Sequence, residues 1–95
     1  MLELDNTAYS SKDFGTARIM LAAGVGQGPN QPCRSCWIKP ADTNTATVYL
    51  GPSNPANANN YPLPQNDLPV HVTNLNKLFF YSTDIDAVIS ILWRG

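Results

Sequence analysis

The fold class of this chain is predicted by two stretches, Lys77-Leu-Phe-Phe-Tyr-Ser82 and Ala87-Val-Ile-Ser-Ile-Leu-Trp93, which are separated by Asp84-Ile-Asp86. In both stretches apolar residues recur at every second position, and side chains of a β-strand alternate between its two faces. The pattern is therefore typical of strands that are buried on one side, joined here by a tight turn. The residues expected to face the core are Leu78, Phe80, Ala87, Ile89, Ile91 and Trp93.

Earlier stretches of the chain are also short, apolar and bounded by turn residues. They are Thr16–Ala23, Ser35–Lys39, Ala46–Leu50 and Pro69–Thr73. The second and third flank turn residues 41–45 and are expected to pair as a hairpin, and in the fourth Val70 and Val72 are expected to point inward. Together these strands predict one all-β domain over residues 1–95, a small antiparallel β-sandwich or barrel of jelly-roll-like type.

Composition agrees with this prediction and excludes several other classes of protein. Charged residues make up 14% of the chain, against about 25% in an average domain. The chain contains ten Asn and eight Pro, which disfavour helix interiors. With a net charge of −1 and scattered basic residues, it lacks the clustered cations of a nucleic-acid binder. No stretch is long and apolar enough to cross a membrane as a helix, so we expect neither nucleic acid nor membrane as a partner.

Two segments are expected to lie outside the regular sandwich. Residues 1–15 are expected to form an N-terminal arm or an extra edge strand. Residues 52–67 concentrate Pro and Asn and are expected to form a long polar loop. Tyr61 and Leu63 are the large apolar side chains of this loop, and we expect them to hold it against the body of the domain.

Cys33 and Cys36, spaced as Cys-x-x-Cys, are the most conspicuous chemical motif. A redox pair of this type needs a helix N-terminus to lower a thiol pKa, and strand-like residues follow instead. A zinc site needs more ligands, and His71 is the only histidine. We therefore expect two inert thiols, with a disulfide and a metal site as the alternatives.

Three other patterns carry less chemistry. Residues 24–28 (Gly-Val-Gly-Gln-Gly) lack the third glycine of a dinucleotide fingerprint, since Pro29 stands there, and are expected to form a flexible crossover. His71 is expected on the surface, and Asp84 and Asp86 in a turn. Because no residues form a credible acid–base or nucleophilic pair, we expect no catalytic residues, no cofactor, no metal and no enzymatic activity.

Aromatic residues on outward faces indicate an interface. Period two places several of them opposite the expected core, and the chain has few charges to keep such faces soluble. Exposed aromatic surface of this kind usually marks a protein–protein contact. The interface candidates are Trp37, Tyr49, Tyr61, Phe79 and Tyr81.

Several short motifs within residues 36–95 carry a resemblance to a known type of protein. They are Trp37-Ile-Lys-Pro-Ala-Asp-Thr-Asn-Thr-Ala-Thr-Val-Tyr-Leu-Gly51, Tyr61-Pro-Leu63, Asn74-Leu-Asn-Lys-Leu78 and Asp86-Ala-Val-Ile-Ser-Ile-Leu92. In this order they resemble small virion structural proteins of tailed bacteriophages, in which a hairpin, a variable polar loop and two closing strands follow one another. The resemblance implies a β-domain that decorates or cements capsids, or that forms part of a fibre or tail.

We therefore expect a non-enzymatic capsid decoration or cement protein, made in the host cytoplasm and located in the virion. It is expected to form a homotrimer or other homo-oligomer and to bind the major capsid protein or another virion protein. Residues 1–14 and the 52–67 loop are expected to make outward contacts. The alternative is a carbohydrate- or receptor-binding module of a phage fibre or tail, with Asn amides and Tyr61 in the 54–61 segment binding sugar. A third hypothesis is a redox or zinc protein built on Cys33 and Cys36.

Overall fold

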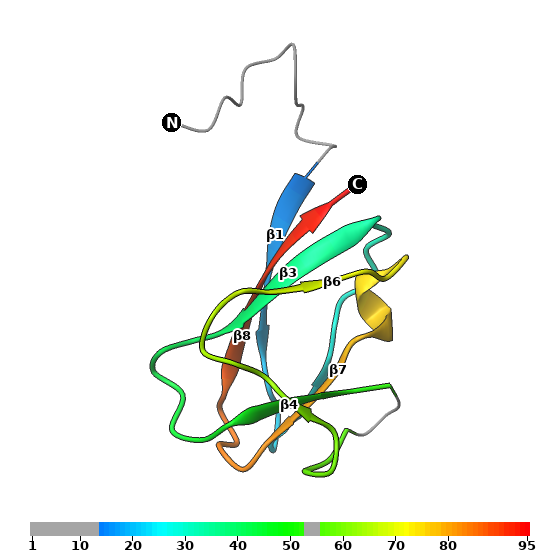
Figure 1. The fold of residues 1–95 in the computed structure, drawn as a ribbon. Helices are drawn as coiled ribbons and strands as arrows, with labels where there is room; N and C mark the ends of the chain where they lie inside the picture. Colours follow the sequence, from blue (N-terminus) through cyan, green and yellow to red (C-terminus); the bar gives the residue numbers. More distant parts are fainter. Residues whose placement is uncertain (1–13, 53–55) are drawn as a thin grey trace.

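Eight β-strands and one short 3-10 helix make up the regular structure of the described residues (Figure 1). The computed structural model describes residues 14–52 and 56–95. The strands are β1 (Phe14–Met20), β2 (Val25–Gln27), β3 (Ser35–Pro40), β4 (Val48–Gly51), β5 (Tyr61–Pro62), β6 (Leu68–Val70), β7 (Phe79–Ser82) and β8 (Val88–Arg94), and the 3-10 helix η1 is Leu75–Lys77. The predicted all-β class is confirmed.

The strands form two antiparallel four-stranded sheets, which pack as the two layers of a sandwich. Sheet A has the order β1-β8-β3-β6, and sheet B has the order β2-β7-β4-β5. The chain passes from one sheet to the other at almost every connection, and β4 and β5 alone follow each other within one sheet. This order is that of an eight-stranded jelly roll. The predicted jelly-roll-like sandwich is confirmed, and the barrel alternative does not apply because the two sheets are separate.

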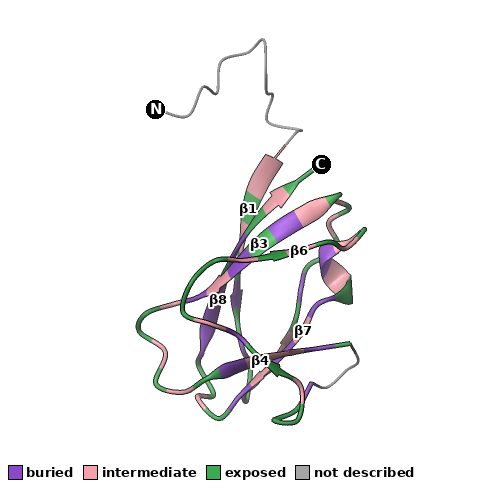
Figure 2. Ribbon diagram, viewed as in Figure 1, coloured by how far each residue is buried: buried purple, intermediate pink, exposed green. Residues whose placement is uncertain are grey.

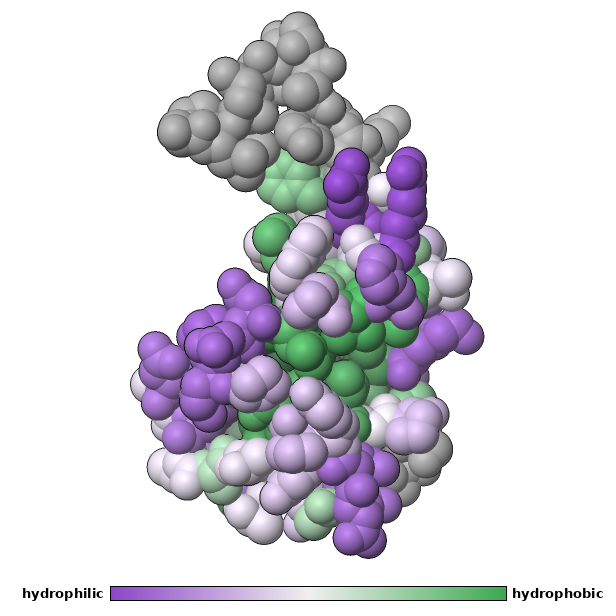
Figure 3. All heavy atoms as spheres, in the orientation of Figure 1, coloured by the Kyte–Doolittle hydropathy of each residue, from purple (hydrophilic) through white to green (hydrophobic). Residues whose placement is uncertain are grey.

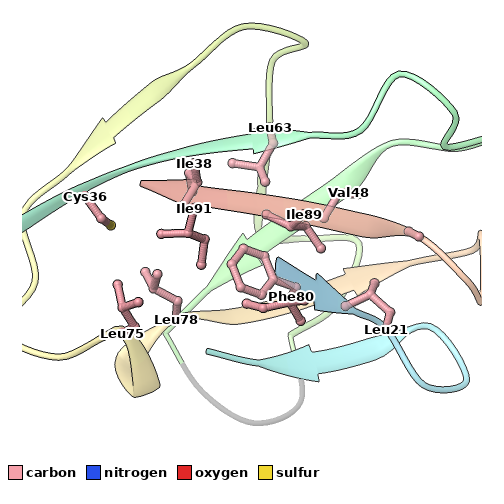
Figure 4. Close-up of a cluster of buried hydrophobic side chains, with 12 residues drawn as sticks. Leu21, Cys36, Ile38, Val48, Leu63, Leu75, Leu78, Phe80, Ile89 and Ile91 are labelled. Atoms are coloured by element: carbon pink, nitrogen blue, oxygen red, sulfur yellow. The ribbon is translucent and has the colours of Figure 1, made fainter. Parts of the chain in front are cut away.

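The hydrophobic core lies between the two sheets (Figure 4). Phe80 and Val48 enter it from sheet B, and four isoleucines enter it from sheet A: Ile19, Ile38, Ile89 and Ile91. Burial of each large side chain contributes about 1.5–3 kcal/mol. Figure 2 shows that buried residues concentrate on the strands, while the connections are largely half-buried or exposed. Of the residues predicted to face the core, Trp93 is half-buried and the rest are buried: Leu78, Phe80, Ala87, Ile89 and Ile91.

Strands β3 and β4 do not form the expected hairpin, because β3 lies in sheet A and β4 in sheet B. The side chain of Asn44 explains this difference. The Val88 N–H donates to Asn44 Oδ1 over 2.8 Å, and Asn44 Nδ2 donates to Val88 O over 2.9 Å. The Asn44 amide thus continues the β3–β8 ladder beyond Ala41, whose N–H also donates to Val88 O. The backbone is free to leave sheet A at this point and cross to sheet B.

The expected glycine-rich crossover is a tight turn followed by a strand. Ala23 and Gly24 have positive φ values of 53° and 82°, and Ala22 and Val25 pair across them. Two central residues with positive φ are typical of a type I′ turn. The segment after the turn forms β2 and pairs with β7. Because the turn takes up Ala22 and Ala23, β1 ends before the boundary predicted from the apolar run.

The polar loop contains a short strand and two buried contacts. Strand β5 pairs with β4, where the sequence predicts no ladder. Leu63 is buried in the core and holds the loop there, and Ala56 is buried near Gly51 of β4, whereas Tyr61 is 55% exposed and does not serve as an anchor. Residues 1–13, with most of the expected arm, and residues 53–55 lie outside the described residues.

The two valines predicted to point inward, Val70 and Val72, are half-buried and pack against the core, as does Leu68. On the side of the molecule in Figure 3, hydrophobic residues are visible in the middle and hydrophilic residues gather around them.

Candidate functional site

A groove of about 760 Å³ lies on the outer face of sheet A. Its residues come from β1, β3 and β8 and from the connection that precedes β6. They include Arg18, Trp37, Lys39, Asp67, Ser90 and Leu92. Pockets of about 300–1,000 Å³ are typical of small-molecule binding sites, so this groove is the candidate ligand site of the domain.

The strand register arranges the groove as two rows of side chains. Trp37 lies opposite Leu92, which forms an apolar row. Two residues further along the strands, Lys39 lies opposite Ser90, and Ser90 lies opposite Arg18. Residues two apart on a strand share a face. The groove therefore places an apolar surface beside two cations.

The polar groups of the groove are available to a ligand. Within residues 14–52 and 56–95, the side chains of Arg18, Asp67 and Ser90 make no hydrogen bond. Lys39 Nζ contacts Asp42 Oδ1 at 3.2 Å in a solvent-exposed ion pair. Exposed pairs of this kind contribute about 0–1 kcal/mol, so a ligand can replace Asp42 at little cost.

The outer face of sheet B differs from that of sheet A in carrying no charge. A row of four residues crosses all four strands in the order Val25, Tyr81, Tyr49 and Pro62. The rings of Tyr49 and Tyr81 are tilted, with centroids 6.2 Å apart, a range in which aromatic pairs attract. Phe79 lies on the same face, two residues from Tyr81. All four strands of sheet B lack Asp, Glu, Lys and Arg.

The five aromatic interface candidates are divided among three places. Tyr49, Phe79 and Tyr81 are brought together on the outer face of sheet B, where they are half-buried. Trp37 lies on the opposite sheet with 38% of its surface exposed, and Tyr61 lies at the β5 edge.

Sequence reasoning did not select the polar residues of the groove. Period two puts Arg18 and Lys39 on outward faces, but their strands are separated along the chain. Only the pairing of both strands with β8 brings these two residues to the same surface.

Both cysteines are free thiols held in the protonated form. Cys36 is fully buried, and burial raises its pKa to about 11, with a smaller contribution from the neighbouring Cys33. Burial also raises the pKa of Cys33, whose Sγ–H donates to Val72 O over 3.3 Å. Protonated thiols are poor nucleophiles and poor metal ligands.

His71 is exposed, as predicted, and in the part of the chain that the structure describes no three His, Cys, Asp or Glu residues gather as a metal site.

Asp84 holds the turn between β7 and β8, as predicted. Its Oδ2 accepts from the Thr45 N–H at 2.7 Å, and its Oδ1 accepts from the Asp86 N–H at 3.1 Å. These two backbone hydrogen bonds lower the pKa of Asp84, and the bond from Thr45 has the larger effect. The carboxylate therefore links the β3–β4 connection to the β7–β8 turn.

The Asn residues of the polar loop use their side-chain oxygens to hold the loop. The Asn57 N–H donates to Asn60 Oδ1, and the Asn59 N–H donates to Asn57 Oδ1, both over 2.8 Å. These oxygens are therefore already engaged near Tyr61.

Among the described residues, no helix has the length and hydropathy that crossing a bilayer requires. The chain matches no protein-family model, no curated protein and no solved structure.

Proposed function

We propose that this protein is a non-enzymatic virion structural protein of a tailed bacteriophage, which decorates or cements the capsid as a homo-oligomer. The uncharged aromatic outer face of sheet B carries the proposal. Interface cores are depleted of charge and enriched in Tyr and Phe. The jelly roll is also an architecture of viral capsid domains, and residues 36–95 resemble small phage proteins of this kind.

The occupant of the sheet B face is a second copy of the chain. Tyr49, Tyr81 and Phe79 remain partly exposed in the monomer, so association would remove their remaining apolar surface from water. This burial contributes about 25 cal/mol per Å². A symmetric oligomer joined at sheet B keeps sheet A accessible, and binding to a shell protein stabilises the shell by mass action.

Sedimentation equilibrium and native mass spectrometry test the proposal. The wild type is expected to be a trimer or another closed oligomer and to co-sediment with capsids of the phage that encodes it. Tyr81→Lys, which places a charge in the centre of the sheet B face, is expected to give a folded monomer. The matched control is Thr83→Lys, at an exposed turn position, which is expected to keep the wild-type mass. A wild type that is monomeric and does not co-sediment with capsids overturns the proposal.

A second candidate function is a carbohydrate- or receptor-binding module of a phage fibre or tail. The groove beside Trp37 favours it, since exposed aromatic rings bind sugar faces and the surrounding polar groups bind hydroxyls. Lectin domains also use the jelly roll. A glycan array probed with the wild-type protein tests this function, and absence of binding to every glycan overturns it.

A further inference from the structure

We infer that the groove on sheet A binds an acidic saccharide, a sugar that carries a carboxylate such as a uronic acid. The inference rests on the second candidate function and adds the class of ligand and the residue that binds each part of it. Three features of the groove carry it: an exposed indole, two cations in the next row and a mixed set of hydrogen-bonding groups.

Trp37 supplies the platform for the sugar ring. It is 38% exposed, and its neighbour Leu92 is 42% exposed. Trp37 lies on β3 and Leu92 on β8, and these two strands pair through their backbones. The exposed surface here therefore consists of side chains. A flat apolar surface of this kind fits the C–H face of a pyranose ring, which stacks on an aromatic side chain.

The two cations are placed to bind the carboxylate of a stacked sugar. Along a strand, alternate residues are about 7 Å apart. The row of Arg18 and Lys39 is therefore one such step from Trp37, on the strands that flank β8. A ring over Trp37 can direct its carboxylate into the space between the two cations. Arg18 can bind the carboxylate through two parallel hydrogen bonds, which are charge-assisted and hence strong.

Asp67 and Ser90 favour a sugar over a simple anion. Asp67 accepts hydrogen bonds and Ser90 both donates and accepts, so together they match sugar hydroxyls. Asp67 would repel a small anion that has no other group to place there, whereas a uronic acid can place its hydroxyls at Asp67 and its carboxylate at the cation row. Arg18 makes no ion pair within the described residues, and Lys39 becomes available when a ligand replaces Asp42, so the cation row selects an acidic sugar over a neutral one.

An acidic peptide is the competing ligand, and the position of the groove argues against it. Extended peptides commonly bind to sheets by pairing with an unpaired edge strand. The groove lies over the face of β1, β8 and β3; β1 is an edge strand of sheet A, but β8 and β3, which carry Trp37, Leu92 and Lys39, are internal strands. A peptide on this face would gain no backbone ladder, whereas a sugar needs none.

Fluorescence titration of Trp93→Phe tests the inference, because Trp37 is then the only tryptophan. The probes are a digalacturonate, a neutral galactose disaccharide of the same linkage and a hexaglutamate peptide. The digalacturonate is expected to change the Trp37 emission saturably and to bind about tenfold more tightly than the neutral disaccharide. Added salt is expected to reduce this preference. Calorimetry on the wild type gives the same comparison if Trp93→Phe perturbs folding.

Two groove variants and one control locate the binding. Arg18→Gln is expected to weaken digalacturonate binding about tenfold and to leave neutral binding unchanged. Trp37→Ala, followed by calorimetry, is expected to abolish binding of both sugars. Lys77→Gln, at an exposed lysine of η1, is expected to bind as the wild type.

Each outcome of the titration has a separate meaning. Equal binding of acidic and neutral disaccharides overturns the inference and leaves the carbohydrate-binding function standing. Tighter binding of hexaglutamate also overturns it. No binding of any sugar, here and on the glycan array, overturns both the inference and the second candidate function. The oligomer proposal is tested by mass and is affected by none of these results.

Discussion

Asn44 is predicted to be the residue that fixes the crossover from sheet A to sheet B. Its carboxamide forms two hydrogen bonds with Val88, one in each direction, at 2.8 and 2.9 Å. Asn44→Ala removes both. The Val88 carbonyl keeps the Ala41 N–H as a donor, but the Val88 N–H has no other partner among the described residues, and Val88 is 7% exposed.

The expected loss follows from these two bonds. A buried donor without a partner costs about 1–3 kcal/mol, and the second hydrogen bond contributes about 0.5–1.5 kcal/mol. Because Asn44 is half-buried, water can partly replace its side chain, and we expect a loss of about 2 kcal/mol in the free energy of unfolding. This is a large part of the roughly 5–14 kcal/mol expected for a domain of this size, and it corresponds to a fall in Tm of about 8–16 °C.

Urea denaturation followed by tryptophan fluorescence measures the effect. Asn66→Ala is the matched control, since Asn66 is exposed and its side chain makes no hydrogen bond to the described residues. It is expected to change stability by less than about 0.5 kcal/mol. Asn44→Asp keeps an acceptor for the Val88 N–H and is expected to lie between the wild type and Asn44→Ala. Equal stability of Asn44→Ala and Asn66→Ala would refute the role of Asn44.

Three further predictions concern stability. Gly28→Ala is expected to cost about 1–3 kcal/mol in urea denaturation, because a Cβ at Gly28 would overlap the backbone oxygen of Leu75; wild-type stability would contradict this. The pKa of Cys36, about 11 in the folded state, exceeds the usual thiol value of about 8.5, so the unfolded state loses its proton first. The free energy of unfolding should therefore fall as pH rises from about 8.5 toward 11, and less steeply in Cys36→Ala. The pKa of Asp84 is lowered by folding, so the stability that it contributes is present at neutral pH and is lost as pH falls below about 4. Asp84→Asn should lower the Tm at neutral pH and flatten its acid dependence; an unchanged acid profile would contradict the role of the Thr45 hydrogen bond.

In the last two strands, the alternation of apolar residues was sufficient to predict which side chains enter the core. Leu78, Phe80, Ile89 and Ile91 were predicted correctly because the face of a strand depends only on its own period. Strand pairing depends on partners elsewhere in the chain. The expected β3–β4 hairpin was wrong because Asn44 binds Val88, a residue 44 positions away, and no local pattern contains that contact.

The candidate sites show the same division between local and distant information. The outward positions of Arg18, Trp37 and Lys39 follow from period two. These three residues share one groove because β8 lies between β1 and β3 in sheet A. Strand β2 was missed for a different reason: Ala23 adopts a positive φ, which residues other than glycine rarely do, so the tight turn before β2 has no clear signal in the sequence.

The low charge of the chain is distributed by sheet rather than by region of sequence. Arg18, Lys39 and Arg94 lie on β1, β3 and β8, all of sheet A, whereas β2, β4, β5 and β7 of sheet B carry no charged residue. Because the chain alternates between the sheets, a local bias in composition would have spread across both faces. Instead, charged residues occur on β1, β3 and β8, and they are absent from the sheet B strands that lie between these in the sequence. The separation agrees with the two proposals, since an uncharged face at sheet B suits contact between copies of the chain and the cations at sheet A suit an acidic ligand.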